Sequence, residues 1–140
     1  MAAFQLYPTV PELEQNANDL AARIKWLALF KSLFSPSKGF NPALITECDF
    51  SGYAKINISA GWIAAVIDGD GNGAALNTLR TFTKTGATSN PNVYGFFYIG
   101  TDDVTVLWAQ LFTDGPYPMT VDGDIIRITP KIVSSSPVFP

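Results

Sequence analysis

Histidine is absent from all 140 residues of the chain. Without imidazole, the sequence excludes Ser-His and Cys-His nucleophilic sites, histidine-ligated zinc and the side chain that most often transfers protons near neutral pH. Cysteine occurs once, at Cys48, so no disulfide can form within the chain. We expect Cys48 to be a small buried hydrophobe in a protein synthesised in a reducing compartment. Catalysis would therefore be restricted to carboxylates and lysines.

Charge is also scarce. Charged residues make up 15% of the chain, against roughly 25% in typical soluble domains. The formal net charge is −3 and the basic residues are scattered singly, which argues against nucleic acid or an anionic membrane as a partner. The longest apolar runs, residues 26–30 and 62–67, are too short to span a bilayer, and the N-terminus does not resemble a secretory signal. A surface with so few charges is often covered in part by another protein chain.

The most informative stretch is residues 92–112, NVYGFFYIGTDDVTVLWAQLF. Aromatic and β-branched residues fill Val93 to Ile99 and again Val104 to Phe112, with turn residues between them, so the stretch predicts a central β-hairpin. Neither strand alternates apolar with polar residues. We therefore expect the hairpin to be covered on both faces, by a second sheet on one face and on the other by something else, which could be another protein chain.

A helix is predicted over about residues 10 to 24. Thr9 and Glu12 form a capping box and Pro11 is tolerated in the first turn. Apolar residues follow at spacings of four and three, at Leu13, Ala17, Leu20, Ile24 and Leu27. This stripe could pack on the sheet of its own chain or form a coiled-coil seam around a symmetry axis. Two heptads are too few for a coiled coil, which favours the first alternative.

Seven or eight short strands are predicted after the helix, with turns about every ten residues. Beside the central hairpin, we expect strands from Trp26 onward, over residues 54–60, 62–68 and 75–84, and an Asp-Gly hairpin joining residues 119–121 to 124–133. The faces we assign are Ala54, Ile56, Ile58 and Ala60 opposite Lys55, Asn57 and Ser59, and Ile126, Ile128 and Ile132 inward with Arg127, Thr129 and Lys131 outward.

This pattern predicts a mainly β fold: a single-domain β-sandwich or jelly-roll-like barrel with one short N-terminal helix and an extended N-terminal arm. The arm, residues 1–8, contains apolar Phe4, Leu6 and Tyr7 together with Pro8. We assign residues 1–25 to assembly contacts, residues 26–133 to the β-sandwich and residues 134–140 to an extended C-terminal tail.

Three sets of side chains are candidates for chemistry. Asp68, Asp70 and Asn72 match the first half of a calcium loop, but position twelve is Leu79 where a bidentate glutamate belongs, so a solvated turn is favoured. Adjacent acids in the segments 47–49 and 102–103 suit turns better than a glycosidase pair. The tryptophans and tyrosines could line a carbohydrate platform, although core or interface positions are more common. We predict no catalytic residue, no metal site and no cofactor.

The order of several motifs resembles that of small virion proteins encoded in tailed-phage genomes. The resemblance covers roughly residues 26 to 133 and includes ITECDFSGYAKINI at residues 45–58 and PMTVDGDIIRITPKI near the C-terminus. The residues that carry it are Phe50, Gly52 and Tyr53; Tyr94, Gly95 and Phe96; Leu107, Trp108 and Ala109; Gly123 and Asp124; and Thr129 and Pro130.

The resemblance implies a non-enzymatic decoration, or cement, protein on the capsid surface. Such a protein would be synthesised in the host cytoplasm, bind the major capsid protein and associate as a homotrimer over a local threefold axis. The expected capsid or subunit interface comprises Phe4, Leu6, Tyr7, Leu13, Leu20, Ile24, Tyr94, Phe96, Tyr98, Trp108 and Phe139. The alternative is a tail-fibre or receptor-binding module that recognises a host surface glycan; a glycoside-cleaving enzyme ranks below both.

Overall fold

The computed structural model describes residues 7–86 and 92–135 as one N-terminal helix followed by short strands. The elements are α1 (Val10–Ala22), β1 (Ile24–Phe30), the 3₁₀ helix η1 (Pro42–Leu44), β2 (Ile56–Asn57), β3 (Val66–Ile67), β4 (Gly73–Leu76), β5 (Arg80–Thr83), β6 (Asn92–Val93), β7 (Gly95–Gly100), β8 (Val106–Leu111), β9 (Tyr117–Pro118), β10 (Ile125–Ile128) and β11 (Lys131–Ser134). The fold is mainly β, as predicted, and forms a β-sandwich-like single domain.

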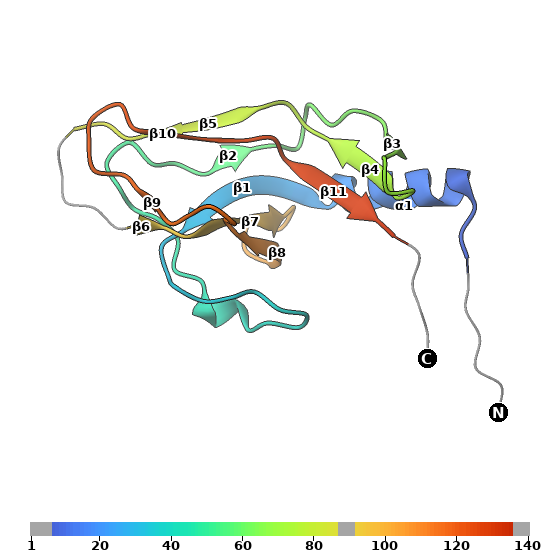
Figure 1. Ribbon diagram of the computed structural model, residues 1–140, viewed down its shortest axis with the longest axis horizontal. Helices are drawn as coiled ribbons and strands as arrows, with labels where there is room; N and C mark the ends of the chain where they lie inside the picture. Colours follow the sequence, from blue (N-terminus) through green and yellow to red (C-terminus); the bar gives the residue numbers. More distant parts are fainter. Residues whose placement is uncertain (1–6, 87–91, 136–140) are drawn as a thin grey trace.

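The first layer is an antiparallel sheet with strand order β2-β1-β7-β8. Its β7–β8 pair is the hairpin predicted from residues 92–112, with Tyr98 opposite Trp108 and Phe96 opposite Gln110. The turn between these strands is built around Asp102 and Asp103. In Figure 1, β1, β7 and β8 lie below β5 and β10 of the second layer.

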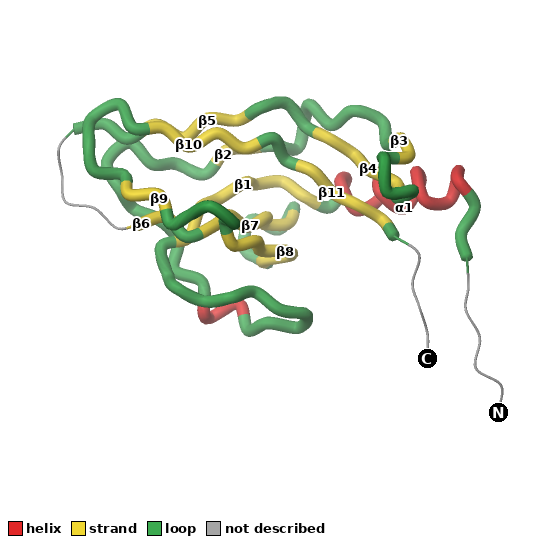
Figure 2. The backbone as a smooth tube through the Cα atoms, viewed as in Figure 1, coloured by secondary structure: helices red, strands yellow, loops and turns green. Residues whose placement is uncertain are grey.

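The second layer is a long antiparallel ribbon in which β4 pairs with β11 and β5 with β10. Figure 2 shows the ribbon along the top of the molecule, with β3 beside β4. The sequence predicted one strand over residues 75–84, but the ladder is interrupted between β4 and β5. Asn77 is buried there and its side-chain nitrogen donates to the carbonyls of Ile58 and Ala60. Pro130, between β10 and β11, accepts from the Asn77 N–H but has no N–H of its own to continue a ladder.

Helix α1 packs on β4, β11 and β3 of its own chain, the arrangement that the short apolar stripe favoured. Thr9 caps it, its hydroxyl accepting from the backbone N–H of Glu12 at 3.4 Å. Leu13, Ala17 and Ala21 form the buried stripe. The helix ends at Ala22 rather than at residue 24, because Ile24 already belongs to β1.

Two hydrophobic clusters lie on opposite faces of the first sheet. The cluster between the layers includes Leu27, Leu29 and Tyr98. Tyr98 also joins the layers through its hydroxyl, which donates to the carbonyl of Lys131 and accepts from its N–H, both at 3.1 Å; burial raises the pKa of this phenol to about 12.

The outer cluster contains Ala28, Phe30, Phe97 and Ile99, all buried. The segment of residues 31–47 covers it, because Phe34 and Ile45 pack against these side chains. The ring centroids of Phe30 and Phe34 are 5.0 Å apart. The C-terminal end of the segment is held beside β1 by an antiparallel β-bridge between Phe30 and Glu47. The hairpin is thus covered on both faces, as predicted, and the second cover comes from the same chain.

Several strand boundaries differ from the prediction. Strands were predicted over residues 54–60 and 62–68, but within these segments only Ile56–Asn57 and Val66–Ile67 are strands. Ile58 is buried and Ile56 half-buried, whereas Ala54 and Ala60 are exposed, so the predicted alternation holds only in part. The first strand ends at Phe30, where residues 31–47 leave the sheet to cover the outer cluster.

The predicted Asp-Gly hairpin is wrong. Residues 119–121 form no strand, and β10 and β11 pair instead with β5 and β4. The Asp124 carboxylate accepts from the N–H groups of Thr120 and Val121 and closes a turn. The face assignment nevertheless holds: the buried side chains are Ile126, Ile128 and Ile132, and the exposed ones are Arg127, Thr129 and Lys131.

Candidate interaction surface

The predicted interface residues fall into four groups. Leu13, Ile24 and Tyr98 are buried, so the prediction that they form an interface is wrong: their side chains are already covered by their own chain. Half-buried positions are Leu20, Tyr94, Phe96 and Trp108, and Tyr7 is exposed. Phe4, Leu6 and Phe139 lie outside the described residues.

The acidic side chains of residues 47–49 serve separate structural contacts. The Tyr53 hydroxyl donates to Glu47 Oε2 at 2.6 Å, and burial together with this bond raises the pKa of Tyr53. Asp49 pairs with Lys31 at 2.8 Å. Cys48, between them, is buried as expected, and burial raises the pKa of its thiol to about 12. This segment therefore offers neither a paired general acid and base nor a reactive thiolate.

The glycine-rich turn at Asp68 is closed by its own backbone. Asp68 Oδ1 accepts from the N–H groups of Asp70 and Asn72 at 2.9 and 3.0 Å, and Oδ2 lies 3.8 Å from Lys131 Nζ. These bonds, led by that from Asn72, lower the pKa of Asp68. Within residues 7–86 and 92–135, no three Cys, Asp or Glu side chains gather as a metal site.

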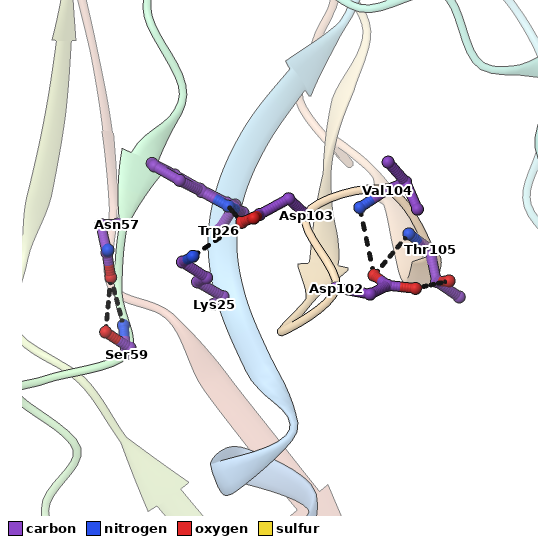
Figure 3. Close-up of polar contacts among 8 residues, drawn as sticks. All are labelled: Lys25, Trp26, Asn57, Ser59, Asp102, Asp103, Val104 and Thr105. Atoms are coloured by element: carbon purple, nitrogen blue, oxygen red, sulfur yellow. Dashed lines mark hydrogen bonds and ion pairs between the residues drawn. The ribbon is translucent and has the colours of Figure 1, made fainter.

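A polar cluster around Trp26 links β1 to the β7–β8 turn (Figure 3). Asp103 Oδ1 accepts from the indole Nε1 of Trp26 at 2.7 Å and pairs with Lys25 Nζ at 2.8 Å. Lys55 Nζ lies 4.7 Å from the indole centroid. Asp103 has a φ of 69°, which the turn imposes. Sequence analysis missed this cluster because Trp26 and Asp103 are far apart along the chain.

Asp102 orders the same turn. Its Oδ1 accepts from the N–H groups of Val104 and Thr105 at 3.1 and 2.9 Å, and its Oδ2 accepts from the Thr105 hydroxyl. The pKa of Asp102 is lowered chiefly by the Thr105 hydroxyl, and that of Asp103 chiefly by Lys25 and then Trp26. The two acids point to different partners and hold the hairpin turn, the role favoured from the sequence.

These carboxylates predict an acid-sensitive stability. Because their folded pKa values are lowered, the unfolded chain binds more protons, so their stabilisation is present above pH 3.8 and is lost as pH falls through the folded pKa values. We expect Asp103→Asn to flatten the decline in melting temperature between about pH 4 and pH 2. Scanning calorimetry of both proteins across this range checks it; identical pH profiles would contradict the assignment.

Strand β8 is an unpaired edge of the first sheet in the part of the chain that the structure describes. The Phe112 N–H donates to the Tyr94 carbonyl at 2.9 Å. In an antiparallel ladder the bonded positions alternate, so Trp108 and Gln110 face β7, and the N–H and C=O groups of Ala109 and Leu111 face away from it. Strand β8 contains no charged residue and no proline. Such an edge is open to pairing with another chain.

A cleft lies on each face of β8. One, of about 400 Å³, is bordered by residues 36–40 and by Leu107, Trp108 and Ala109. The other, of about 190 Å³, is bordered by residues of β7, β8 and β11, including Phe96, Trp108 and Lys131. Arg23 Cζ lies 5.6 Å from the Trp108 ring centroid. Both clefts therefore combine aromatic surface with nearby cations.

The outward face of the β11-β4-β3 sheet carries exposed aliphatic side chains beside Lys131, which lies opposite Leu76. Val66 lies opposite Ala74, and Ala74 opposite Val133, so the three share one face, with Leu76 two residues further on. Val66, Leu76 and Val133 are 61%, 41% and 39% exposed. We call these three residues the apolar outer face. The opposite face of the same sheet packs against α1.

No protein-family model, curated protein or solved structure matches this chain. Among the described residues, no helix is long and apolar enough to cross a membrane.

Proposed function

We propose that the protein is a non-enzymatic virion structural protein that decorates and stabilises a tailed-phage capsid, binding between capsid subunits as a homotrimer. Its partners are the major capsid protein and copies of itself, and its place is the capsid surface. The observation that carries the proposal is the apolar outer face, a solvent-exposed row of aliphatic side chains on a sheet whose other face packs the core. The resemblance in motif order to tailed-phage virion proteins is the reason for proposing a phage capsid as the particle.

The arrangement of polar groups supports a binding role. The acids predicted as alternatives for catalysis each have a structural partner of their own: Glu47 accepts from the Tyr53 hydroxyl, Asp49 and Asp103 form ion pairs, and Asp102 holds a turn. Association would stabilise the shell by mass action, since a protein that binds only the assembled lattice shifts the equilibrium away from free subunits. The apolar outer face is the surface for the capsid, and the β8 edge is a separate surface for other copies of the protein.

A charge on the apolar outer face is expected to abolish attachment. Val66→Asp should weaken binding to undecorated phage heads by at least about tenfold, because an unpaired carboxylate would be desolvated at the contact. Val121→Asp is the matched control, since Val121 is 60% exposed against 61% for Val66 but lies in the turn that Asp124 closes. Co-sedimentation of purified protein with heads measures both.

The wild-type protein should also raise the temperature at which the heads disrupt. Failure of the wild-type protein to sediment with heads would refute the capsid role. Equal binding by both variants would remove the apolar outer face from the contact.

A second candidate is recognition of a host surface glycan by a tail-fibre or receptor-binding module. It is favoured by Trp108, a half-buried indole that borders both clefts beside β8, because aromatic rings stack on sugar rings. A glycan-array screen of wild type and Trp108→Ala separates the candidates: saturable binding that Trp108→Ala removes, without attachment to heads, would replace the capsid proposal.

A further inference from the structure

Two clefts lie between the β10–β11 segment and the aromatic side chains that face it. The smaller, of about 190 Å³, is bordered by Phe96 and Trp108. The larger, of about 350 Å³, is bordered by Phe112, Tyr117 and residues 125–127. Ring contacts join them, since the centroids of Phe96 and Phe112 are 6.0 Å apart and those of Phe112 and Tyr117 are 4.9 Å apart. We call the two clefts together the aromatic groove.

The four rings offer apolar surface to the groove. Each is half-buried and packs on one side against the hydrophobic cluster between the layers. The Tyr117 hydroxyl is already bonded to Asp114, so that ring contributes its apolar part. Gln110 is exposed and lies opposite Phe96, so its amide is on the same face of the hairpin. Ring surface beside an amide suits a sugar, which has an apolar C–H face and a rim of hydroxyls.

The charges at the groove are positive, in a chain with 12 acidic and 9 basic residues. Arg127 borders the larger cleft and Lys131 the smaller one, and Arg23 Cζ lies 5.6 Å from the Trp108 centroid. Among the described residues, no Asp or Glu borders either cleft. Lys131 lies 3.8 Å from Asp68, whereas Arg23 and Arg127 form no ion pair in the part of the chain that the structure describes. These side chains are exposed, so they form the rim of the groove rather than its floor.

We propose that the aromatic groove binds a linear acidic polysaccharide, with sugar rings stacked on the aromatic side chains and carboxylates paired with Arg23 and Arg127. A guanidinium forms two parallel hydrogen bonds to a carboxylate, and cations spread over two clefts match an anion that repeats along a polymer. The inference rests on the glycan-recognition candidate for function and gives that candidate a site and a ligand class. It neither requires nor excludes attachment to a capsid.

An acidic peptide fits the groove less well than a saccharide does. A bound main chain needs unpaired backbone groups, and those beside the groove are occupied. The N–H and C=O of Lys131 both bond to the Tyr98 hydroxyl at 3.1 Å, and the backbone groups of Trp108 and Gln110 face β7. The unpaired groups of β8 lie in the plane of the sheet and do not point into the groove. Sugar hydroxyls and carboxylates bond to side chains and need no strand edge.

The test measures binding of labelled oligogalacturonate, a linear chain of uronic acids, to the full chain, with dextran oligomers of the same length as the neutral probe. We expect saturable binding of oligogalacturonate and none of dextran. Arg127→Glu should weaken binding at least about tenfold, because a carboxylate replaces the cation that pairs with the ligand. Lys38→Glu is the matched control, since Lys38 is exposed and borders the cleft on the other face of β8; its affinity should stay within about twofold of the wild type.

Trp108→Ala tests the stacking and should also weaken binding at least about tenfold. Circular dichroism and thermal melting check that each variant is folded. Because Arg127 is exposed, the result for Arg127→Glu does not depend on repacking of the core. Unchanged affinity in both Arg127→Glu and Trp108→Ala would overturn the site.

Two further probes separate the ligand classes. Equal affinity for a poly-glutamate peptide would mean that charge alone is recognised, and would overturn the inference. Equal binding of dextran, or a neutral glycan whose binding Trp108→Ala removes, would keep the glycan candidate and overturn the acidic class. Attachment to phage heads without oligogalacturonate binding would overturn the inference alone, whereas oligogalacturonate binding by a protein that does not sediment with heads would overturn the capsid role alone.

Discussion

Gly73→Ala is expected to lower the free energy of unfolding by about 3 kcal/mol, at the upper end of the cost of overpacking a core. A Cβ at Gly73 would lie 2.1 Å from the Leu13 carbonyl oxygen and 3.0 Å from the Glu14 nitrogen. Both atoms belong to the backbone of α1, which cannot move aside as a flexible side chain can. The methyl group would therefore push the helix away from β4 and loosen the contacts of Ala17.

Gly69→Ala is the matched control, in the turn just before β4. A Cβ there meets nothing within 4 Å, so we expect a change within about 0.5 kcal/mol. Urea denaturation followed by both circular dichroism and tryptophan fluorescence measures the two variants and tests for two-state behaviour. Equal stabilities for the two variants would contradict the close packing of α1 on β4.

Phe30→Ala should cost about 4 kcal/mol, the usual range for truncating a buried aromatic side chain being 3–5 kcal/mol. Phe30 is 0% exposed, and its ring packs against Phe34 at 5.0 Å and Phe97 at 6.5 Å between centroids. For a domain whose total stability is typically about 5–15 kcal/mol, the variant would be marginal.

Leu33→Ala is the control in the same covering segment, because Leu33 is 75% exposed; its effect should stay near zero. Repeating the Phe30→Ala measurement over a hundredfold range of protein concentration separates packing within the chain from packing between chains. A loss that disappears on dilution would mean that another chain, rather than residues 31–47, covers this face of the first sheet.

The sequence predicted the elements whose signals are local. The capping box located α1 because Thr9 and Glu12 are neighbours on one turn. The β7–β8 hairpin was predicted because both strands and their turn are contiguous in the chain. Alternation placed Ile126 and Arg127 on the correct faces because side chains reverse direction at every residue of a strand.

The same local reasoning did not predict which distant strands pair. The Asp-Gly signal suggested a hairpin, but β10 and β11 pair with β5 and β4, which occur earlier in the chain. Turn residues indicate where a chain reverses and do not identify the strand it joins. Apolar patterning had the same limit: it selected Leu13, Ile24 and Tyr98 as interface residues, although each is buried by its own chain.

The sequence by itself determined a mainly β domain with one capped helix, a central hairpin needing cover on both faces, and a chain without histidine chemistry. These follow from composition and from the period of apolar residues, which are properties of neighbouring positions. Only the tertiary structure decided that residues 31–47 provide the second cover, that Trp26 and Asp103 meet, and that the outer edge of β8 is unpaired and Val66 is exposed. Those outcomes depend on which distant segments come together. The free energy of such contacts depends on residues far apart in the chain, so the pattern of neighbouring residues does not determine it.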